Sequence, residues 1–289
     1  MHGGLRVLGV VLCLTLAGCG GFVGGTGPTE AVTPAPVPAP DPETVRIAPG
    51  LTEAGIDDAD ALARAHVTRL SNRSYTVDRR RLVETTEGTV RLRQHTRAEI
   101  AAGYDSYRAV RTVTGSTVTD RTARIRWADG RAVQWVTENG TTDRRIVADS
   151  RGIGGPPLPP RAALSFDPTY NQRFRILFGA VNVTDVSLTN EEVMQINRAP
   201  LYRVSTDGAT DRGRVPLVGG DRVGGVSFTA TVTPKGIVRS YALQYTVVRD
   251  GTRLRVTESV RYSDVGTTTV PSEESFPRRS QTGKPPRSD

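Results

Sequence analysis

Lysine, histidine and cysteine are all scarce in this chain of 289 residues. Both cysteines, Cys13 and Cys19, lie near the amino terminus. The rest of the chain can therefore form no disulfide and no cysteine-ligated zinc site. The histidines, His2, His66 and His95, leave little for acid–base catalysis by imidazole. Hydrophobic residues make up 37% of the chain, which suffices for one core of about 200 residues and excludes a polytopic membrane protein.

The sequence also lacks the motifs that carry common enzyme chemistry. It contains no Gly-x-Ser-x-Gly elbow, no His-Glu-x-x-His helix, no Walker phosphate loop and no EF-hand loop. The adjacent pairs Glu191-Glu192 and Glu273-Glu274 lie in polar stretches. Neighbouring side chains on a strand point to opposite faces, so these pairs do not make an acid–base site. We predict a non-enzymatic protein with no catalytic residue, metal or cofactor, and a hydrolase with an unusual site is the lesser alternative.

The chain carries a net positive charge, and almost all of its basic residues are arginines. Its 38 basic residues exceed its 30 acidic ones by eight, and only Lys235 and Lys284 are lysines. Arginine suits phosphate contacts, so nucleic-acid binding is one interpretation. The arginines are, however, spread along alternating strand patterns, and the basic tail at residues 278–287 carries few charges. We therefore expect no nucleic-acid partner, although a basic surface can help to hold a domain beside an anionic membrane or glycan layer.

The amino terminus has the pattern of a lipoprotein signal. Residues 5–16 are mostly apolar and are followed by Leu16-Ala17-Gly18-Cys19, which resembles a lipobox. At about a dozen residues the run is too short to span a bilayer. We predict a signal peptide at residues 1–18 and a lipidated Cys19 that anchors the protein to the outer face of the cytoplasmic membrane. A plain secretory signal with an incidental cysteine is the alternative.

The next segment is too rich in Gly and Pro to bury a core. Residues 19–48 therefore read as the lipidated cysteine and a tether, flexible at its Gly-rich start and stiffened into polyproline II further on. We expect one folded domain at residues 49–270 and a disordered basic tail at residues 271–289. Three sequons make these asparagines candidates for glycosylation: Asn72, Asn139 and Asn182.

The domain opens with a helical pattern. Small and apolar positions recur at helical spacing from residue 57 to residue 70. The aspartates Asp57, Asp58 and Asp60 stand at the start, where they suit the helix cap and the dipole. His66 falls on the apolar stripe, and we interpret it as a core histidine in preference to a ligand or a base.

Alternating patterns then predict an antiparallel meander, with Asp129-Gly130 and Asn139-Gly140 as tight turns. The predicted strands span residues 74–83, 88–97, 107–118, 123–127, 132–137 and 142–148. The second strand carries a polar row that we interpret as the solvated face of a sheet, with an anion site as the alternative. This row consists of Arg91, Arg93, His95 and Arg97.

A second helix is predicted in the middle of the domain. Asp167 is placed as its cap and Pro168 in its first turn. Its apolar stripe consists of Tyr170, Phe174, Leu177, Phe178 and Val181. Residues 201–205 are a further strand candidate, whereas residues 152–160 and 210–220 carry no clear pattern.

The last part of the domain predicts a three-stranded meander over residues 226–232, 237–248 and 252–263. A tight Asp-Gly loop pairs Tyr245 with Val256 and Leu243 with Glu258. For the preceding hairpin, a four-residue connection pairs Ala230 with Arg239 and keeps the apolar residues together. Two charged residues, Arg239 and Glu258, then lie on the apolar face. Each must reach a partner, reach the rim or line a wet cavity, and we favour a rim or structural placement over ligand contact.

Three stretches resemble a family of uncharacterised haloarchaeal lipoproteins, and the match runs from the signal to about residue 270. They are Ala48-Pro49-Gly50-Leu51-Thr52, Ser71-Asn72-Arg73-Ser74-Tyr75-Thr76, and Arg261-Tyr262-Ser263-Asp264-Val265-Gly266 followed by Thr267-Thr268-Thr269-Val270. The order of elements is similar to the half-barrels of LolA and LppX type lipid carriers. The resemblance implies an α+β fold, in which a curved antiparallel sheet holds two or three helices on its concave face.

The resulting hypothesis is a membrane-anchored, non-enzymatic lipoprotein that binds or carries a lipid or other apolar ligand in a half-barrel cavity. The residues expected to line that cavity are Phe174, Phe178, Tyr241, Leu243, Tyr245, Arg239 and Glu258. The alternative is a surface interaction module with a solid core, whose partner is an envelope protein or a glycan. An open apolar pocket favours the carrier, and a filled core favours the module.

Overall fold

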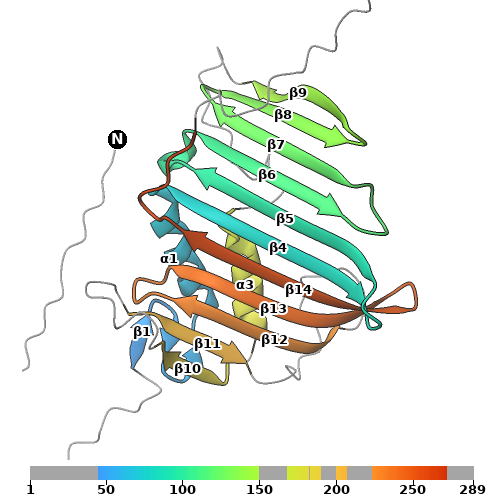
Figure 1. Ribbon diagram of the computed structural model, residues 1–289. Helices are drawn as coiled ribbons and strands as arrows, with labels where there is room; N and C mark the ends of the chain where they lie inside the picture. Colours follow the sequence, from blue (N-terminus) through green and yellow to red (C-terminus); the bar gives the residue numbers. More distant parts are fainter. Residues whose placement is uncertain (1–44, 150–167, 182, 190–199, 207–222, 272–289) are drawn as a thin grey trace, which may run out of the picture. The chain divides into compact units, whose positions relative to one another are not determined.

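A computed structural model of the protein describes residues 45–149, 168–181, 183–189, 200–206 and 223–271 (Figure 1). The predicted signal peptide, Cys19, most of the tether, the predicted cap Asp167, Asn182 and the basic tail after residue 271 lie outside these residues, as do the two unassigned segments at 152–160 and 210–220. None of the helices in the described ranges is both long enough and apolar enough to cross a membrane.

The described elements form two antiparallel sheets and two α-helices. The small sheet contains β1 (Arg46–Ala48), β2 (Leu51–Thr52) and β3 (Gly55–Ile56). The helices are α1 (Ala59–Ser71) and α3 (Asn171–Ala180), and a 3-10 turn, η2, spans Ala102–Tyr104. The large sheet contains β4 (Tyr75–Thr85), β5 (Val90–Ile100), β6 (Tyr107–Thr114), β7 (Arg121–Ala128), β8 (Arg131–Glu138), β9 (Thr141–Asp149), β10 (Asp185–Leu188), β11 (Tyr202–Thr206), β12 (Val223–Val232), β13 (Val238–Arg249) and β14 (Thr252–Ser263).

The large sheet has eleven strands in the order β10-β11-β12-β13-β14-β4-β5-β6-β7-β8-β9. Every neighbouring pair except β14–β4 joins strands that follow one another in the chain, and β14–β4 joins the last strand to the first. This one long-range pairing converts two meanders into a single sheet. The predicted antiparallel α+β architecture is confirmed at this level.

Helix α1 forms as predicted. The Asp58 carboxylate caps it by accepting a hydrogen bond from the Ala61 backbone N–H at 2.8 Å. Its buried side chains are Leu62, Ala63, His66 and Leu70, which recur at helical spacing. The helix is therefore built by a local cap and held by one apolar stripe.

The tight turns are also confirmed. Asp129, Gly130, Asn139 and Gly140 all have positive φ, as a two-residue turn between twisted strands requires. The same is true of the Asp250-Gly251 turn. That turn sets the predicted β13–β14 register, in which Tyr245 lies opposite Val256 and Leu243 opposite Glu258.

The predicted β12–β13 register is wrong by two residues. Ala230 lies opposite Tyr241, not Arg239, and Phe228 lies opposite Leu243. Two departures add up to this shift. The connection spans residues 233–237, one more than predicted, because Val232 pairs with Val238, and the next pair skips a residue and joins Thr231 to Ser240. Arg239 is thus an extra residue on β13, a β-bulge that no pattern of alternation signals.

The start of the central helix is a second correction. Helix α3 begins at Asn171, and Tyr170 precedes it in the left-handed conformation with no side-chain cap. Pro168 lies before the helix, where its carbonyl accepts a hydrogen bond from the Tyr262 hydroxyl at 2.9 Å. The residues predicted to form the first helical turn therefore make tertiary contacts instead, and the helix begins after them. The stripe of Phe174, Leu177 and Phe178 is buried as predicted.

The sequence patterns missed the shortest elements. Strand β10 and the small sheet were not predicted, and β1 begins at Arg46, before the expected domain start at residue 49. Strands this short contain too few residues to show alternation. The proposed strand at 201–205 is present as β11.

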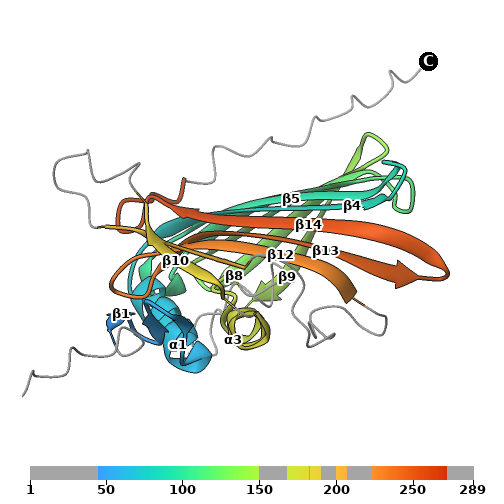
Figure 2. The ribbon, with the colours of Figure 1, turned by 90° about the horizontal axis from the view of Figure 1, so that it is seen from below.

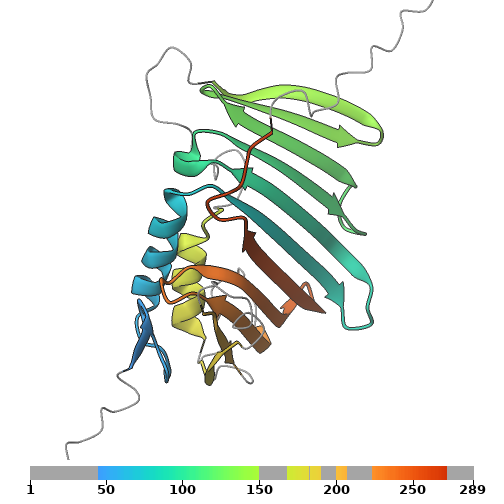
Figure 3. The ribbon, with the colours of Figure 1, turned by 60° about the vertical axis from the view of Figure 1, so that its left-hand side comes forward.

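Both helices pack on the same face of the curved sheet (Figure 2). The His66 ring of α1 lies 4.9 Å from that of Tyr262 on β14, and the Phe174 ring of α3 lies 5.4 Å from that of Tyr241 on β13. We call this the inner face and the opposite one the outer face. Strands β6 to β9 extend the sheet beyond the two helices (Figure 3).

Candidate functional site

The five apolar residues expected to line a cavity come together in the core, where two lie on α3 and three on β13. Phe174, Phe178, Tyr241, Leu243 and Tyr245 are each at most 3% exposed. The Phe174 and Phe178 rings stack at 5.1 Å between centroids, and Phe178 meets Phe228 of β12 edge-on at 6.0 Å. These side chains pack against one another in the core. Their assignment as ligand contacts remains a prediction.

Glu258 belongs to a buried ion network. Its carboxylate accepts hydrogen bonds from Arg79 Nη2 at 3.0 Å and from the Tyr241 hydroxyl, and it lies 2.9 Å from Arg173 Nη2. Burial raises the pKa of Glu258, but the positive charges of Arg173 and Arg79 outweigh it, so the net shift is downward. Glu258 thus reaches partners from α3, β4 and β13, as its favoured structural placement requires.

The same carboxylate acts on its neighbours. Burial, together with the charge of Glu258, raises the pKa of the Tyr241 hydroxyl well above its ordinary value. The phenol therefore stays protonated and donates to the carboxylate. Arg239, by contrast, is only partly buried and lies in the bulge, so it does not share this apolar environment.

His66 is a core histidine, as predicted. It is fully buried, and its Nδ1 accepts a hydrogen bond from the Val238 backbone N–H at 3.1 Å. Burial lowers its pKa from 6.5 to about 3, against a smaller opposing contribution from a hydrogen bond with the Thr169 backbone. A neutral ring that accepts from a backbone amide suits structure and not proton transfer.

The predicted polar row of β5 lies on the outer face. Arg93, His95 and Arg97 are exposed, and His95 Nε2 lies 2.7 Å from the Asp78 carboxylate on the neighbouring strand. The interpretation as a solvated face is confirmed. Two sequon asparagines, Asn72 and Asn139, are likewise exposed.

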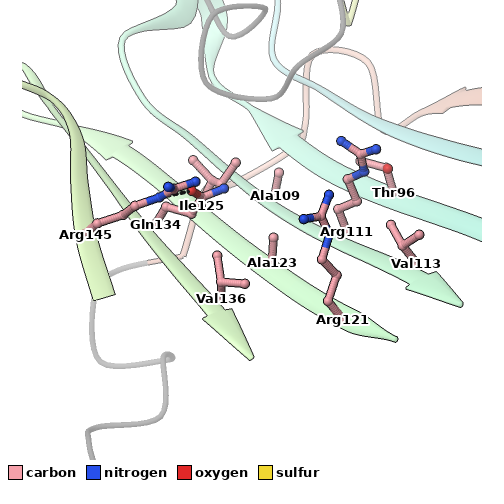
Figure 4. Close-up of a pocket in the computed structure, with 10 residues that line it drawn as sticks. All are labelled: Thr96, Ala109, Arg111, Val113, Arg121, Ala123, Ile125, Gln134, Val136 and Arg145. Atoms are coloured by element: carbon pink, nitrogen blue, oxygen red, sulfur yellow. Dashed lines mark hydrogen bonds between the residues drawn. The ribbon is translucent and has the colours of Figure 1, made fainter. Parts of the chain in front are cut away.

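A cavity of about 130 Å³ opens on the inner face beyond the helices (Figure 4). Its lining comes from five successive strands, β5 to β9. The residues are Thr96, Ala109, Arg111, Val113, Arg121, Ala123, Ile125, Gln134, Val136 and Arg145. Small apolar side chains thus alternate with three guanidinium groups.

Strand pairing fixes how these residues meet. Arg111 lies opposite Thr96 on one side and Ala123 on the other, while Arg121 lies opposite Val113. Arg111 Nη2 donates to Gln94 Oε1 at 3.4 Å, and Arg145 Nε donates to Gln134 Oε1 at 2.7 Å. Within the described ranges, Arg111, Arg121 and Arg145 form no ion pair. The cavity can therefore offer cationic donors over an apolar floor.

The arginines of this cavity were not singled out from the sequence. The available signal was local: Tyr107, Ala109 and Val113 are buried on one face of β6, and Arg111 occupies the same parity. An arginine in an otherwise apolar row marks an inner-face charge. The sequence of β6 does not show which strands lie beside Arg111.

No family model matches this chain, and no curated protein sequence matches it. Among solved structures, it is similar to a DUF1329 family protein from Desulfovibrio piger, with 11% identity, a TM-score of 0.26, and coverage of 75% of this chain and 94% of that one. It is also similar to an outer membrane lipoprotein-sorting protein domain from Vibrio parahaemolyticus, with 10% identity, a TM-score of 0.26, and coverage of 74% and 94%. Likenesses at this TM-score carry no argument about function. The resemblance to haloarchaeal lipoproteins remains a prediction.

Proposed function

We propose that this chain is an exported, lipid-anchored, non-enzymatic protein that binds a lipid or another amphiphile on the concave inner face of its half-barrel sheet. Lipidated Cys19 holds it at the outer face of the cytoplasmic membrane, and the tether gives the domain reach. The observation that carries the proposal is the cavity beyond the helices, because it joins an apolar floor to cationic side chains.

The lining of the cavity suits a molecule that is apolar at one end and polar at the other. Ala109, Ala123, Ile125 and Val136 offer apolar contact, and the guanidinium groups stand among them. Half of the lining residues are apolar and half are polar, so the wall is more polar than that of most small-molecule pockets and suits the polar end of such a molecule. The packed aromatic cluster around Phe174 then forms the closed end of the concave face, and the two helices cover it.

The size of the cavity limits what it can hold. An apolar cavity of about 150 Å³ accommodates benzene, so about 130 Å³ takes a head group or the end of a chain. The remainder of a longer ligand extends along the inner face of β6 to β9.

Native mass spectrometry of residues 20–289, purified without detergent from an exporting host, tests the proposal. We expect an added mass that organic solvent removes and that proves to be an amphiphile. A protein that stays free of added mass after incubation with host lipids would contradict ligand binding.

Two substitutions on one strand locate the site. Ala123→Phe fills the floor of the cavity, whereas Thr122→Phe adds the same ring on the outer face of β7. We expect Ala123→Phe to lose the added mass and Thr122→Phe to keep it. Equal retention by both variants would place the ligand elsewhere.

The second candidate function is a surface interaction module that binds an envelope protein. Two observations favour it: the aromatic cluster under the helices is packed, and edge strand β9 exposes Ile146 (48%) and Val147 (40%). Exposed edge strands are sites where a partner adds a strand. Substitution of Ile146 by Lys would abolish such pairing and leave amphiphile binding intact.

A further inference from the structure

Two arginines on neighbouring strands point into the inner-face cavity, and the nearest inner-face carboxylate in the ladder, Glu138 of β8, lies opposite Arg121 on the side away from Arg111. Arg111 of β6 and Arg121 of β7 both belong to inner-face rows, because Arg111 is paired with Ala123 and Arg121 with Val113. Their guanidinium groups lie side by side in Figure 4. Diagonal neighbours of this kind in an antiparallel ladder are close enough for long side chains to share one ligand.

The surroundings of Arg111 leave its charge uncompensated. Its Nε atom is buried and has no hydrogen-bond acceptor within the part of the chain that the structure describes. Among the described residues, its one side-chain hydrogen bond goes to neutral Gln94 and is long at 3.4 Å. Burial lowers the pKa of Arg111, and the positive charges of Arg121 and Arg79 lower it further. No negatively charged group contributes to this shift of the pKa.

A second pair of arginines on the same face has a carboxylate that balances its positive charge. Arg79 and Arg173 converge on Glu258, at 3.0 Å and 2.9 Å. Burial of a cation is normally accompanied by such a partner, because an unpaired buried charge is costly. Arg111 and Arg121 lie as a pair that can share an anion, and Glu138, opposite Arg121 on β8, forms no ion pair with either of them among the described residues.

We infer that Arg111 and Arg121 bind the anionic group, a phosphate or a carboxylate, of the molecule that occupies the cavity. This inference deepens the proposed function and rests on it for the apolar part of the ligand. Guanidinium groups present paired N–H donors that match phosphate and carboxylate oxygens. Ala109, Ala123 and Ile125 then contact the chain attached to that group.

Binding measurements on residues 20–289 with three probes test the inference. The probes are dodecyl phosphate below its micelle concentration, neutral dodecyl glycerol, and inorganic phosphate. We expect dodecyl phosphate to bind at least about tenfold more tightly than dodecyl glycerol, and its affinity to fall as salt is added.

Three variants supply the controls. Arg111→Gln and Arg121→Gln each remove one cavity charge, whereas Arg124→Gln removes a charge from the outer face of the same β7 strand. We expect the first two to lose about tenfold or more in affinity for dodecyl phosphate. Arg124→Gln should bind as the parent does. Arg121 is exposed, so its variant folds even if Arg111→Gln does not.

The melting temperature without ligand separates binding from a structural role. Removal of an uncompensated, partly buried charge should leave the melting temperature of Arg111→Gln unchanged or higher, while the shift caused by dodecyl phosphate disappears. A lower melting temperature together with unchanged affinity would overturn the inference, because Arg111 would then be structural.

The probes also distinguish the two proposals. Equal binding of both amphiphiles would overturn the anion site and leave the proposed function standing. A shift in melting temperature with inorganic phosphate alone, dependent on Arg111, would support the anion site with a free anion as ligand and contradict amphiphile binding. No binding of any probe would overturn both.

Discussion

Glu258 joins α3 to the sheet, because its carboxylate on β14 contacts both Arg173 of α3 and Arg79 of β4. Glu258→Gln keeps the shape but leaves two buried cations without a counter-charge. We expect the variant to lose about 3–5 kcal/mol of unfolding free energy in urea melts. Arg239→Gln serves as the matched control, because Arg239 lies in the β12–β13 bulge and should cost less than about 0.5 kcal/mol. Equal losses in the two variants would contradict the network.

His66 predicts how the stability depends on pH. In the unfolded chain this histidine takes up a proton below its ordinary pKa of 6.5, whereas burial holds the folded pKa near 3. The unfolded state therefore binds more protons over that interval, and stability falls as the pH drops from 6.5. Between pH 6.5 and about pH 5 the expected loss is about 2 kcal/mol.

Urea melts at several pH values compare the parent with His66→Gln, whose amide oxygen can still accept from the Val238 N–H. The difference between the two proteins cancels the other titrating groups. Glu258, with an ordinary pKa of 4.5 and a downward shift, contributes only at lower pH. A parallel decline in both proteins would show that His66 is not the cause.

Single residues were predictable where the pattern around them was local. His66 follows from its place on the α1 stripe, which a helix of fixed period puts against the core. Arg239 and Arg111 were not predictable in the same way. A bulge moved the first off the apolar face, and only the strands beside β6 reveal that the second lies in a cavity.

At the scale of elements, Gly50 holds the start of α1 against the small sheet. Its φ is +72°, and a Cβ atom there would come within 2.0 Å of the Asp58 carbonyl oxygen. Gly140 has a similar φ of +76°, in the β8–β9 turn, with open space around it. We expect Gly140→Ala to cost about 1–2 kcal/mol from backbone strain alone.

Gly50→Ala adds a clash with backbone to the same strain, so we expect a loss of more than about 3 kcal/mol in unfolding free energy. Chemical denaturation of both variants measures the difference. Similar losses would mean that the strands of the small sheet shift easily and do not fix the helix start.

Elements bounded by their own signals were predicted within a few residues. The β13–β14 hairpin is fixed by Asp250-Gly251, whose left-handed backbone admits one register. Helix α3 is the counterexample, because Pro168 and Tyr170 are held by contacts with β14 and the core and not by a capping residue.

At the scale of the whole molecule, the lipid anchor is a separate prediction. Cys19→Ser removes the thiol that carries the lipid, so the variant should be released to the medium or remain unprocessed. Fractionation of cells and medium, with the mass of the mature chain, measures this. A substituted chain that is still processed and membrane-bound would contradict the lipoprotein assignment.

The sequence by itself determined the alternation of the strands, the three tight turns and the capped helix α1, because each depends on residues within one turn or one strand of each other. Tertiary structure alone decided the β14–β4 pairing, which sets Val260 opposite Arg79 and Glu258 opposite Arg81. It also decided which arginines share the cavity. Both depend on contacts between distant parts of the chain. The free energy of these contacts comes from burial across the complete sheet, and the local spacing of residues does not reveal it.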